Sequence, residues 1–205
     1  MANLYERYIL PRVIHHVCGL SPMSKQREKV VPDAHGVVLE LGVGSGHNLK
    51  YYNASQVKHV IGIDPTPDAS KLSQAKEKSD ISFELIKESA EVLPVADESI
   101  DTVVCTYVLC TIPDVHQALS ECRRVLKKDG RLLFVEHGLA PDKGVQKTQN
   151  RINGIWKKVA GGCHLNRDIS SIISSSGFEI TDHDTMYLPG WKPATWNIWG
   201  QAQTV

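Results

Sequence analysis

Short apolar runs recur along the first two thirds of the chain, separated by segments with helical spacing. The segments expected as strands are 37–41, 60–63, 81–85, 102–106 and 131–136. Most of them are continuously apolar, as strands buried on both faces of a parallel sheet are. Between them, helices are expected from near His47, over 65–78 and over 114–130. This alternation predicts right-handed βαβ units around a parallel sheet.

The pattern changes at both ends of the chain. Beyond Gly138, helices are expected over 149–159 and from a cap at Asn166 to Gly177, followed by an antiparallel hairpin of strands 178–186 and 195–204. Before the first strand, residues 1–20 have roughly helical apolar spacing, and a second helix is expected to start with Ser21 as its N-cap. We expect one domain over 1–205, in which a helical lid (1–31) covers a core (36–205).

Four polar residues stand where predicted strands end, namely Glu40, Asp64, Thr106 and His137. Because ligands of open parallel sheets bind outside the carboxyl ends of the strands, these side chains are expected to share one site.

A turn rich in glycine follows the first of these strands. Gly42, Gly44 and Gly46 alternate with other residues after Glu40, so the third position of a dinucleotide fingerprint falls on His47. Glycines there allow positive φ angles and a close backbone approach to an anionic ligand. The acid-plus-glycines pattern resembles motif I of class I S-adenosylmethionine (SAM) methyltransferases. Asp64, about 20 residues later, suits the hydroxyls of a ribose.

The composition limits the kinds of partner that the chain is expected to bind. Lys and Arg together number 23, as do Asp and Glu, which leaves no positive excess to hold a nucleic-acid backbone. The five cysteines are scattered without a C-x-x-C pair, which indicates reduced thiols in the cytoplasm and argues against disulfides or a metal site. Neither a membrane-spanning run nor a signal peptide is evident. We therefore expect a small-molecule acceptor and a monomer or homodimer.

Narrower motifs point to one branch of the methyltransferases. They are Lys25 to Glu28, Gly44 to Tyr52, Ile63 to Pro67, Val103 to Cys110, Val135 to His137, Trp156, and Gly162 to Arg167. On these residues, the chain from about residue 22 onwards resembles the methyltransferase-like family of thiol S-methyltransferases, within the ubiquinone- and menaquinone-type group. Membrane-bound relatives carry a hydrophobic N-terminal anchor that these residues lack.

The resemblance implies a Rossmann-like class I methyltransferase fold, with a mostly parallel seven-stranded sheet, a C-terminal antiparallel hairpin and helices on both faces. It also implies SAM as methyl donor, with S-adenosylhomocysteine as product. The expected cofactor-binding residues are Glu40, Gly42, Gly44, Gly46, Asn48, Asp64, Pro65, Ser89, Ala90, Glu91, Thr106 and Tyr107. Among them, the glycine turn would hold the methionine carboxylate, Asp64 the ribose, and Ser89-Ala90 the adenine, at a position where Asp is common.

The expected acceptor is a thiol or hydrogen sulfide. Thiols have a pKa of about 8.5 and are already partly ionised near neutrality, so a strong base is optional. His137 is the expected catalytic proton acceptor. The expected acceptor contacts are Tyr5, Tyr8, Cys110, Cys163 and His164. Core packing is an open alternative for these cysteines, as partners within the core are for His137.

Other functions are left open. One is methylation of carbon or oxygen in a quinone-like or phenolic molecule, which needs a firmer base and a larger flat pocket. Another is a protein that binds SAM without turnover. Nucleic-acid methylation is the least favoured, because Thr106-Tyr107-Val108-Leu109 stands where amino-group methylases carry an Asn/Asp-Pro-Pro-aromatic motif.

Overall fold

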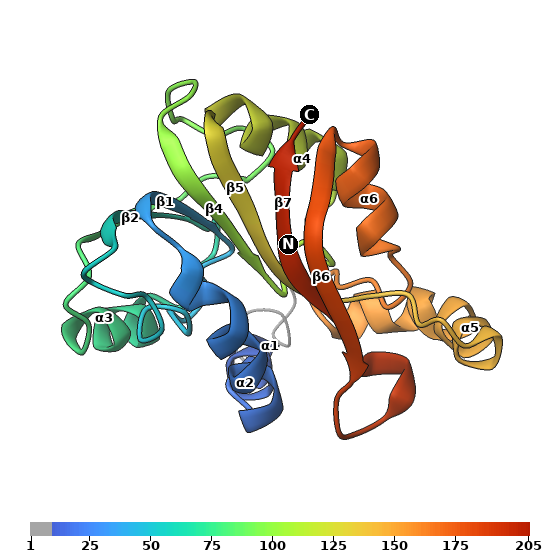
Figure 1. Ribbon diagram of the computed structural model, residues 1–205. Coiled ribbons are helices and arrows are strands. Elements are labelled where there is room, and N and C mark those ends of the chain that lie inside the picture. Colours follow the sequence, from blue (N-terminus) through green and yellow to red (C-terminus); the bar gives the residue numbers. More distant parts are fainter. Residues whose placement is uncertain (1–9) are drawn as a thin grey trace.

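In the computed structural model, which describes residues 10–205, seven strands form a single sheet with helices packed against it (Figure 1). The strands are β1 (Gly36–Leu41), β2 (Val57–Ile63), β3 (Phe83–Ile86), β4 (Ile100–Thr106), β5 (Leu126–His137), β6 (Phe178–Tyr187) and β7 (Trp196–Thr204). The α-helices are α1 (Leu10–Cys18), α2 (Ser21–Val30), α3 (Ala69–Glu77), α4 (Val115–Val125), α5 (Lys143–Val159) and α6 (Ile169–Ser175). Two short 3₁₀ turns are η2 (Val31–Asp33) and η3 (Lys192–Ala194).

The strand order of the sheet is β3-β2-β1-β4-β5-β7-β6. Strands β1 to β5 pair in parallel, and β7 runs antiparallel to both β5 and β6. This confirms the predicted mostly parallel sheet with a C-terminal hairpin. Because β1 lies between β2 and β4, the crossovers leave it toward opposite sides. That reversal opens a crevice at the carboxyl end of β1, where open α/β sheets bind their ligands.

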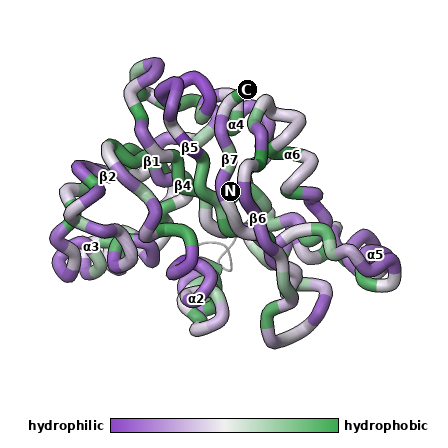
Figure 2. The backbone as a smooth tube through the Cα atoms, viewed as in Figure 1, coloured by the Kyte–Doolittle hydropathy of each residue, from purple (hydrophilic) through white to green (hydrophobic). Residues whose placement is uncertain are grey.

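Alternate residues of the central strands enter two separate cores. Leu39, Val103 and Phe134 pack with apolar residues of α4 and α6 on one face of the sheet. Val38 and Val104 pack with Val30 at the end of α2 and Leu72 of α3 on the other. Both faces are therefore covered, which explains why the strands read as continuous apolar runs. Figure 2 shows the apolar colour concentrated along the inner strands, whereas α3 and α5 are largely hydrophilic.

The expected α-helix from near His47 does not form. Residues 44–51 make successive turns instead, in which the Leu49 N–H donates to the Gly46 carbonyl at 3.2 Å and the Tyr51 N–H to the Asn48 carbonyl at 2.8 Å. Gly46 has a φ of +75°, which a right-handed helix cannot continue. In addition, Asn48 turns its amide inward to the carboxylate of Glu40.

Several predicted helix ends are wrong by a few residues. Helix α4 stops at Val125, not near Gly130, because Leu126 turns to extended backbone and pairs with Ile100 of β4. Asp168 replaces Asn166 as the cap of α6, since its carboxylate accepts the Ser171 N–H at 3.1 Å.

Smaller differences affect the remaining elements. Ser21 is the first residue of α2, and Leu20 takes the N-cap position without a side-chain bond. Helices α3 and α5 span Ala69–Glu77 and Lys143–Val159, against the predicted 65–78 and 149–159. Among the described residues, every helix is too short or too polar to cross a membrane.

Candidate active site

The turn after β1 exposes its backbone to a cavity. Gly42 and Gly44 have φ angles of +67° and +55°, values that residues with side chains rarely adopt. A Cβ on Gly42 would come within 2.4 Å of Val108, whereas the nearest atom to one on Gly44 lies 3.9 Å away. The Gly42 position is therefore packed against the loop after β4, and the Gly44 position is open toward a ligand.

Asp64 ties the glycine turn to the end of β2. Its Oδ2 accepts the N–H of Gly44 at 2.7 Å, and its Oδ1 accepts the N–H of Thr66 at 2.8 Å. Each carboxylate oxygen keeps a further lone pair for a hydroxyl donor. Asp64 is thus placed both to order the turn and to receive the ribose expected there.

A buried polar network lies below the turn. Glu40 accepts the Asn48 amide N–H at 3.0 Å and the Tyr52 hydroxyl at 2.7 Å. Asn48 also donates to the Thr106 hydroxyl at 3.0 Å, which links the ends of β1 and β4. Burial raises the pKa of Glu40 to about 7, although the bonds from Tyr52 and Asn48 oppose that shift. The network positions the cavity floor, and Glu40 carries only a partial charge near neutrality.

A cavity of about 470 Å³ opens at this carboxyl edge of the sheet. The residues expected to bind the cofactor that line it are Glu40, Gly42, Gly44, Asn48, Asp64, Pro65, Ser89, Ala90, Thr106 and Tyr107. Segments far apart in sequence complete the wall, among them Thr111 to Pro113 and Ala160-Gly161. Three of the four strand-end residues predicted to share one site, Glu40, Asp64 and Thr106, therefore line the same cavity. His137 does not line it.

Two expected cofactor residues do not line the cavity. A Cβ on Gly46 would meet Ala75 and Leu72, so this glycine allows α3 to approach the turn. Glu91 accepts the Ser89 hydroxyl at 2.6 Å and the Asp114 N–H at 2.8 Å, which joins the loop after β3 to the start of α4. Both residues shape the site from behind, and a direct contact with the cofactor stays a prediction.

The N-terminal helices supply cavity residues that the sequence reasoning missed. Arg27 of α2 is 3% exposed and lines the cavity; it donates to the Cys18 carbonyl at 2.6 Å, while its Nε has no hydrogen-bond partner among the described residues. Its guanidinium carbon lies 5.0 Å from the centre of the Tyr107 ring. Arg27 opposes the rise in the pKa of Glu40 but forms no salt bridge among the described residues, and a buried guanidinium of this kind suits an anionic group of a ligand. Lys25 to Glu28 is one of the motifs that carry the family resemblance, but its pattern alone does not place Arg27 in the cavity.

Two histidines join α1 to the glycine turn. The rings of His15 and His47 stack with centroids 4.9 Å apart, and His47 Nε2 lies 3.2 Å from the His15 carbonyl oxygen. Burial and the nearby Arg27 lower the pKa of His47 to about 4, so this ring is neutral at pH 7. His15 Nδ1 is buried and has no hydrogen-bond partner within residues 10–205, and both histidines line the cavity.

Tyr107 adopts a strained backbone at the end of β4. Its φ is +57°, which costs a residue with a side chain roughly 1–2 kcal/mol. The surroundings hold it there: its N–H donates to the Val135 carbonyl at 2.7 Å and its hydroxyl to Asn197 Oδ1 at 2.7 Å. Burial raises the pKa of Tyr107 far above its ordinary value, so the phenol stays protonated. Strain of this kind concentrates at functional sites.

Three of the expected catalytic and acceptor-binding residues form a group that does not line the cavity. His137 Nε2 lies 3.0 Å from Cys163 Sγ, and the ligating atoms of Cys110, His137 and Cys163 lie within 4.8 Å of one another. None of these three, nor His164, is among the lining residues. Their roles at the reacting atoms stay predictions. Tyr5 and Tyr8 lie outside the described residues.

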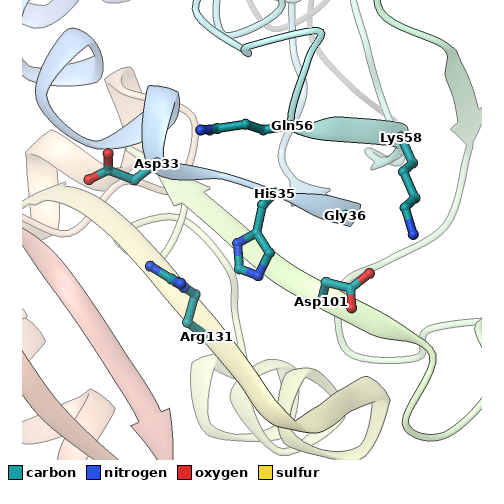
Figure 3. A pocket seen from close by; sticks show the side chains of 7 residues that line it. All are labelled: Asp33, His35, Gly36, Gln56, Lys58, Asp101 and Arg131. Atoms are coloured by element: carbon teal, nitrogen blue, oxygen red, sulfur yellow. The ribbon is translucent and has the colours of Figure 1, made fainter.

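A second depression, of about 540 Å³, lies at the opposite edge of the sheet near the amino ends of β1, β2 and β4 (Figure 3). It is lined by Asp33, His35, Gly36, Gln56, Lys58, Asp101 and Arg131. Asp101 accepts the Val37 N–H at 2.7 Å and pairs with Lys127 at 2.7 Å. These bonds lower the pKa of Asp101 against the opposing effect of its burial, and they give the carboxylate a role in joining β1, β4 and β5.

Comparisons with known proteins identify the family of this chain and structures with the same fold. The family model described as "Methyltransferase domain" matches residues 39–134. The rat thiol S-methyltransferase TMT1B is 32% identical over 193 residues, which cover 87% of this chain and 78% of that protein. A phosphatidylethanolamine N-methyltransferase of Cereibacter sphaeroides is 38% identical over 160 residues, 74% of each chain. A SAM-dependent methyltransferase of Methanosarcina mazei superposes with a TM-score of 0.64 at 21% identity, over 82% of this chain and 92% of that one.

The fold and the glycine-turn site define a SAM-dependent methyltransferase of the Rossmann-like class, as the sequence motifs predicted. More narrowly, the chain belongs to the methyltransferase family that contains the thiol S-methyltransferases TMT1B. Its cofactor is SAM, and the residues present fit that group. The open position at Gly44 leaves room for an anion at the turn, and the unpartnered Arg27 Nε offers a donor to it.

Proposed function

We propose that this enzyme transfers the methyl group of SAM to the sulfur of a small thiol or of hydrogen sulfide. The observation that carries the proposal is the part of the cavity wall formed by Ile14, Cys18, Ile112, Pro113, Ala160 and Gly161. These side chains are small or apolar and none of them is a carboxylate or amine, so an acceptor bound there has to ionise readily, with no base stronger than a histidine. Thiols meet that demand, with a pKa of about 8.5. The thiol S-methyltransferase relatives support the same acceptor class.

Bound SAM supplies an electrophilic methyl group on a sulfonium. In our proposal the turn amides and Arg27 hold its carboxylate, Asp64 receives its ribose hydroxyls, and Ser89 and Ala90 lie beside its adenine. Tyr107 and the Glu40 network keep the floor rigid, so that donor and acceptor sulfur are aligned for an in-line displacement. Helix α1, part of the predicted lid over 1–31, contributes Ile14 and Cys18 to the wall and limits the access of water.

His15 is the proton acceptor that the cavity offers. In the described part of the chain its Nδ1 has no hydrogen-bond partner, and His15 lines the cavity, whereas the predicted acceptor, His137, does not. Replacement by Phe, which preserves stacking on His47, should reduce turnover about tenfold or more at pH 6 and much less at pH 9, where the thiol ionises unaided. His16→Phe, on an exposed neighbour, is the matched control. If His137→Phe shows this pH-dependent loss and His15→Phe does not, the role returns to His137.

The acceptor class is tested by turnover with methyl-labelled SAM. The panel contains hydrogen sulfide, alkyl and aryl thiols, phenols, quinols and phosphatidylethanolamine, the last because of the relative named for it. Labelled thioether as the main product is the expected result. If the label appears on oxygen, carbon or nitrogen acceptors instead, the protein is still a methyltransferase but the proposed thiol acceptor is wrong. Absence of product from every acceptor, with SAM bound, would favour a non-catalytic SAM-binding protein.

A further inference from the structure

Three soft or borderline ligand atoms meet behind the acceptor side of the cavity. Among the described residues, Cys110, His137 and Cys163 offer Sγ, Nε2 and Sγ atoms within 4.8 Å of one another. Cys110 follows the end of β4, His137 ends β5, and Cys163 follows α5. We propose that these three side chains form a binding site for a thiophilic cation, Zn²⁺, which the sequence spacing alone argued against.

The separations suit a zinc ion after small shifts. Zn–S and Zn–N bonds of about 2.3 and 2.0 Å at tetrahedral angles place two sulfurs about 3.8 Å apart and a sulfur and a nitrogen about 3.5 Å apart. The His137 Nε2 to Cys163 Sγ distance is 3.0 Å, and the widest separation in the group is at most 4.8 Å. Movements of under about 1 Å, within the reach of χ rotations, therefore complete three ligand positions.

The backbone holds the two cysteine segments in place without the ion. Gly161 and Gly162 have φ angles of +63° and +87° and turn the chain back after α5. The His164 N–H then donates to the Cys110 carbonyl at 2.8 Å, which joins the segment to the end of β4. A preformed site of this kind lowers the ordering cost of binding.

The surroundings favour a thiolate at Cys163 once a cation is present. The Trp156 indole N–H donates to its sulfur at 3.3 Å, as an outer partner of a metal thiolate does. Without a cation the neighbouring Cys110 thiol and burial raise the pKa of Cys163 well above its ordinary value. Two thiolates, a neutral imidazole and Zn²⁺ sum to zero charge, which removes the penalty of burying an isolated anion.

Three protein ligands leave a fourth position for water or another small ligand, as in open zinc sites. The ion would lie behind the wall that Thr111 and Gly161 contribute to the cavity, since these residues neighbour Cys110 and Cys163 in the chain. It would fix the segment 160–164 against the sheet. The site does not depend on which acceptor is methylated.

The test is a titration of the reduced, metal-free full chain with ZnCl₂ against a chromogenic chelator. We expect one zinc per chain with a Kd below micromolar. Cys110→Ser, His137→Gln and Cys163→Ser should each weaken binding at least 100-fold, and Cys122→Ser, a buried cysteine of α4 outside the group, should bind like the wild type. Unfolding curves of the metal-free variants show whether each one folds.

Cobalt gives a second measurement on the unmodified chain. Co²⁺ should produce an intense near-ultraviolet thiolate charge-transfer band together with visible bands of four-coordinate geometry. Absence of saturable zinc binding, or equal binding by Cys163→Ser, overturns the proposal. So does formation of a Cys110–Cys163 disulfide under mild oxidant that Zn²⁺ does not suppress, because the pair would then be a redox couple.

Discussion

The carboxylate of Asp64 carries two functions at once, because it binds the backbone of the glycine turn and also borders the cavity. Asp64→Ala removes the acceptor of the Gly44 and Thr66 N–H groups and the partner expected for the ribose. We expect SAM affinity to fall about 10- to 100-fold. Isothermal titration of SAM measures it, with Asp80→Ala, an exposed carboxylate, as control. Unchanged affinity would contradict the placement of the cofactor at this edge.

Glu40 makes the stability of the cofactor-free protein depend on pH. Its pKa is about 7 in the folded chain, above the ordinary value of 4.5, so the folded state binds the proton more tightly than the unfolded state. Its contribution is therefore most favourable below about pH 4.5 and is lost as pH rises toward 7, by at most about 3 kcal/mol. Glu40→Gln keeps acceptor and donor atoms but cannot ionise.

The matching measurement is urea unfolding of wild type and Glu40→Gln at pH 5.5 and pH 8. The quantity to compare is the free energy of unfolding of Glu40→Gln minus that of wild type. This difference should be more favourable to the variant at pH 8 than at pH 5.5. Because Glu136 is also buried and its pKa is raised to about 7, the difference between the two proteins isolates Glu40 better than the wild-type curve does. A difference that does not change with pH would remove Glu40 as its source.

At the scale of elements, the hairpin of β6 and β7 depends on a glycine. A Cβ on Gly200 would lie 2.1 Å from the Asp182 carbonyl oxygen and 2.8 Å from the His183 Cα, next to the register shift between Ile180 and Asp182. Backbone atoms of a paired strand can move aside only at a large cost in free energy, so Gly200→Ala should destabilise the chain by about 2–4 kcal/mol.

A matched glycine in α5 provides the control for this change. A Cβ on Gly154 meets nothing within 4 Å, so Gly154→Ala should raise stability by up to about 1 kcal/mol through helix propensity. Thermal or urea unfolding measures both variants. Equal effects of the two substitutions would show that the contact with Asp182 does not limit the hairpin.

The elements that could be predicted from the sequence are those whose local hydrophobic pattern determines their secondary structure. The buried strands ending at Leu41, Ile63 and Thr106 have both faces covered, so their apolar runs carry the signal alone. The turns at 44–51 were misassigned as helix because Asn48 bonds to Glu40, a tertiary contact. The end of α4 was misplaced because Leu126 pairs with a distant strand.

The same distinction applies to the site. Glycine spacing and strand ends predicted the cofactor edge from local sequence. The convergence of Arg27 and His15 on the cavity depends on how α1 and α2 pack, which no local pattern shows. The meeting of Cys110, His137 and Cys163 likewise requires three elements to dock.

At the scale of the molecule, the cofactor cavity is lined by parts that lie far apart in the sequence. The cavity wall includes α1, α2, the glycine turn, the loops after β2 to β4 and the segment after α5. SAM at 100 times its Kd should therefore stabilise the whole chain by about 2.7 kcal/mol. In Arg27→Met the same SAM concentration should raise the melting temperature clearly less, whereas Arg12→Met, on the exposed side of α1, should respond like wild type. An equal shift in Arg27→Met would remove Arg27 from the cofactor site.

Because the strand order reverses at β1, most contacts assigned to the donor and most contacts assigned to the acceptor come from different segments of the chain. Strands β1 to β3 and their loops carry most of the contacts assigned to the donor, together with Arg27 of α2, whereas the wall on the acceptor side comes from α1 and from segments after β4 and α5. The acceptor segments can therefore diversify under selection while the donor segments are preserved. Exchange of residues 10–18, 108–113 and 138–205 for the matching segments of a family member with another acceptor should therefore change acceptor preference and leave the affinity for SAM nearly intact.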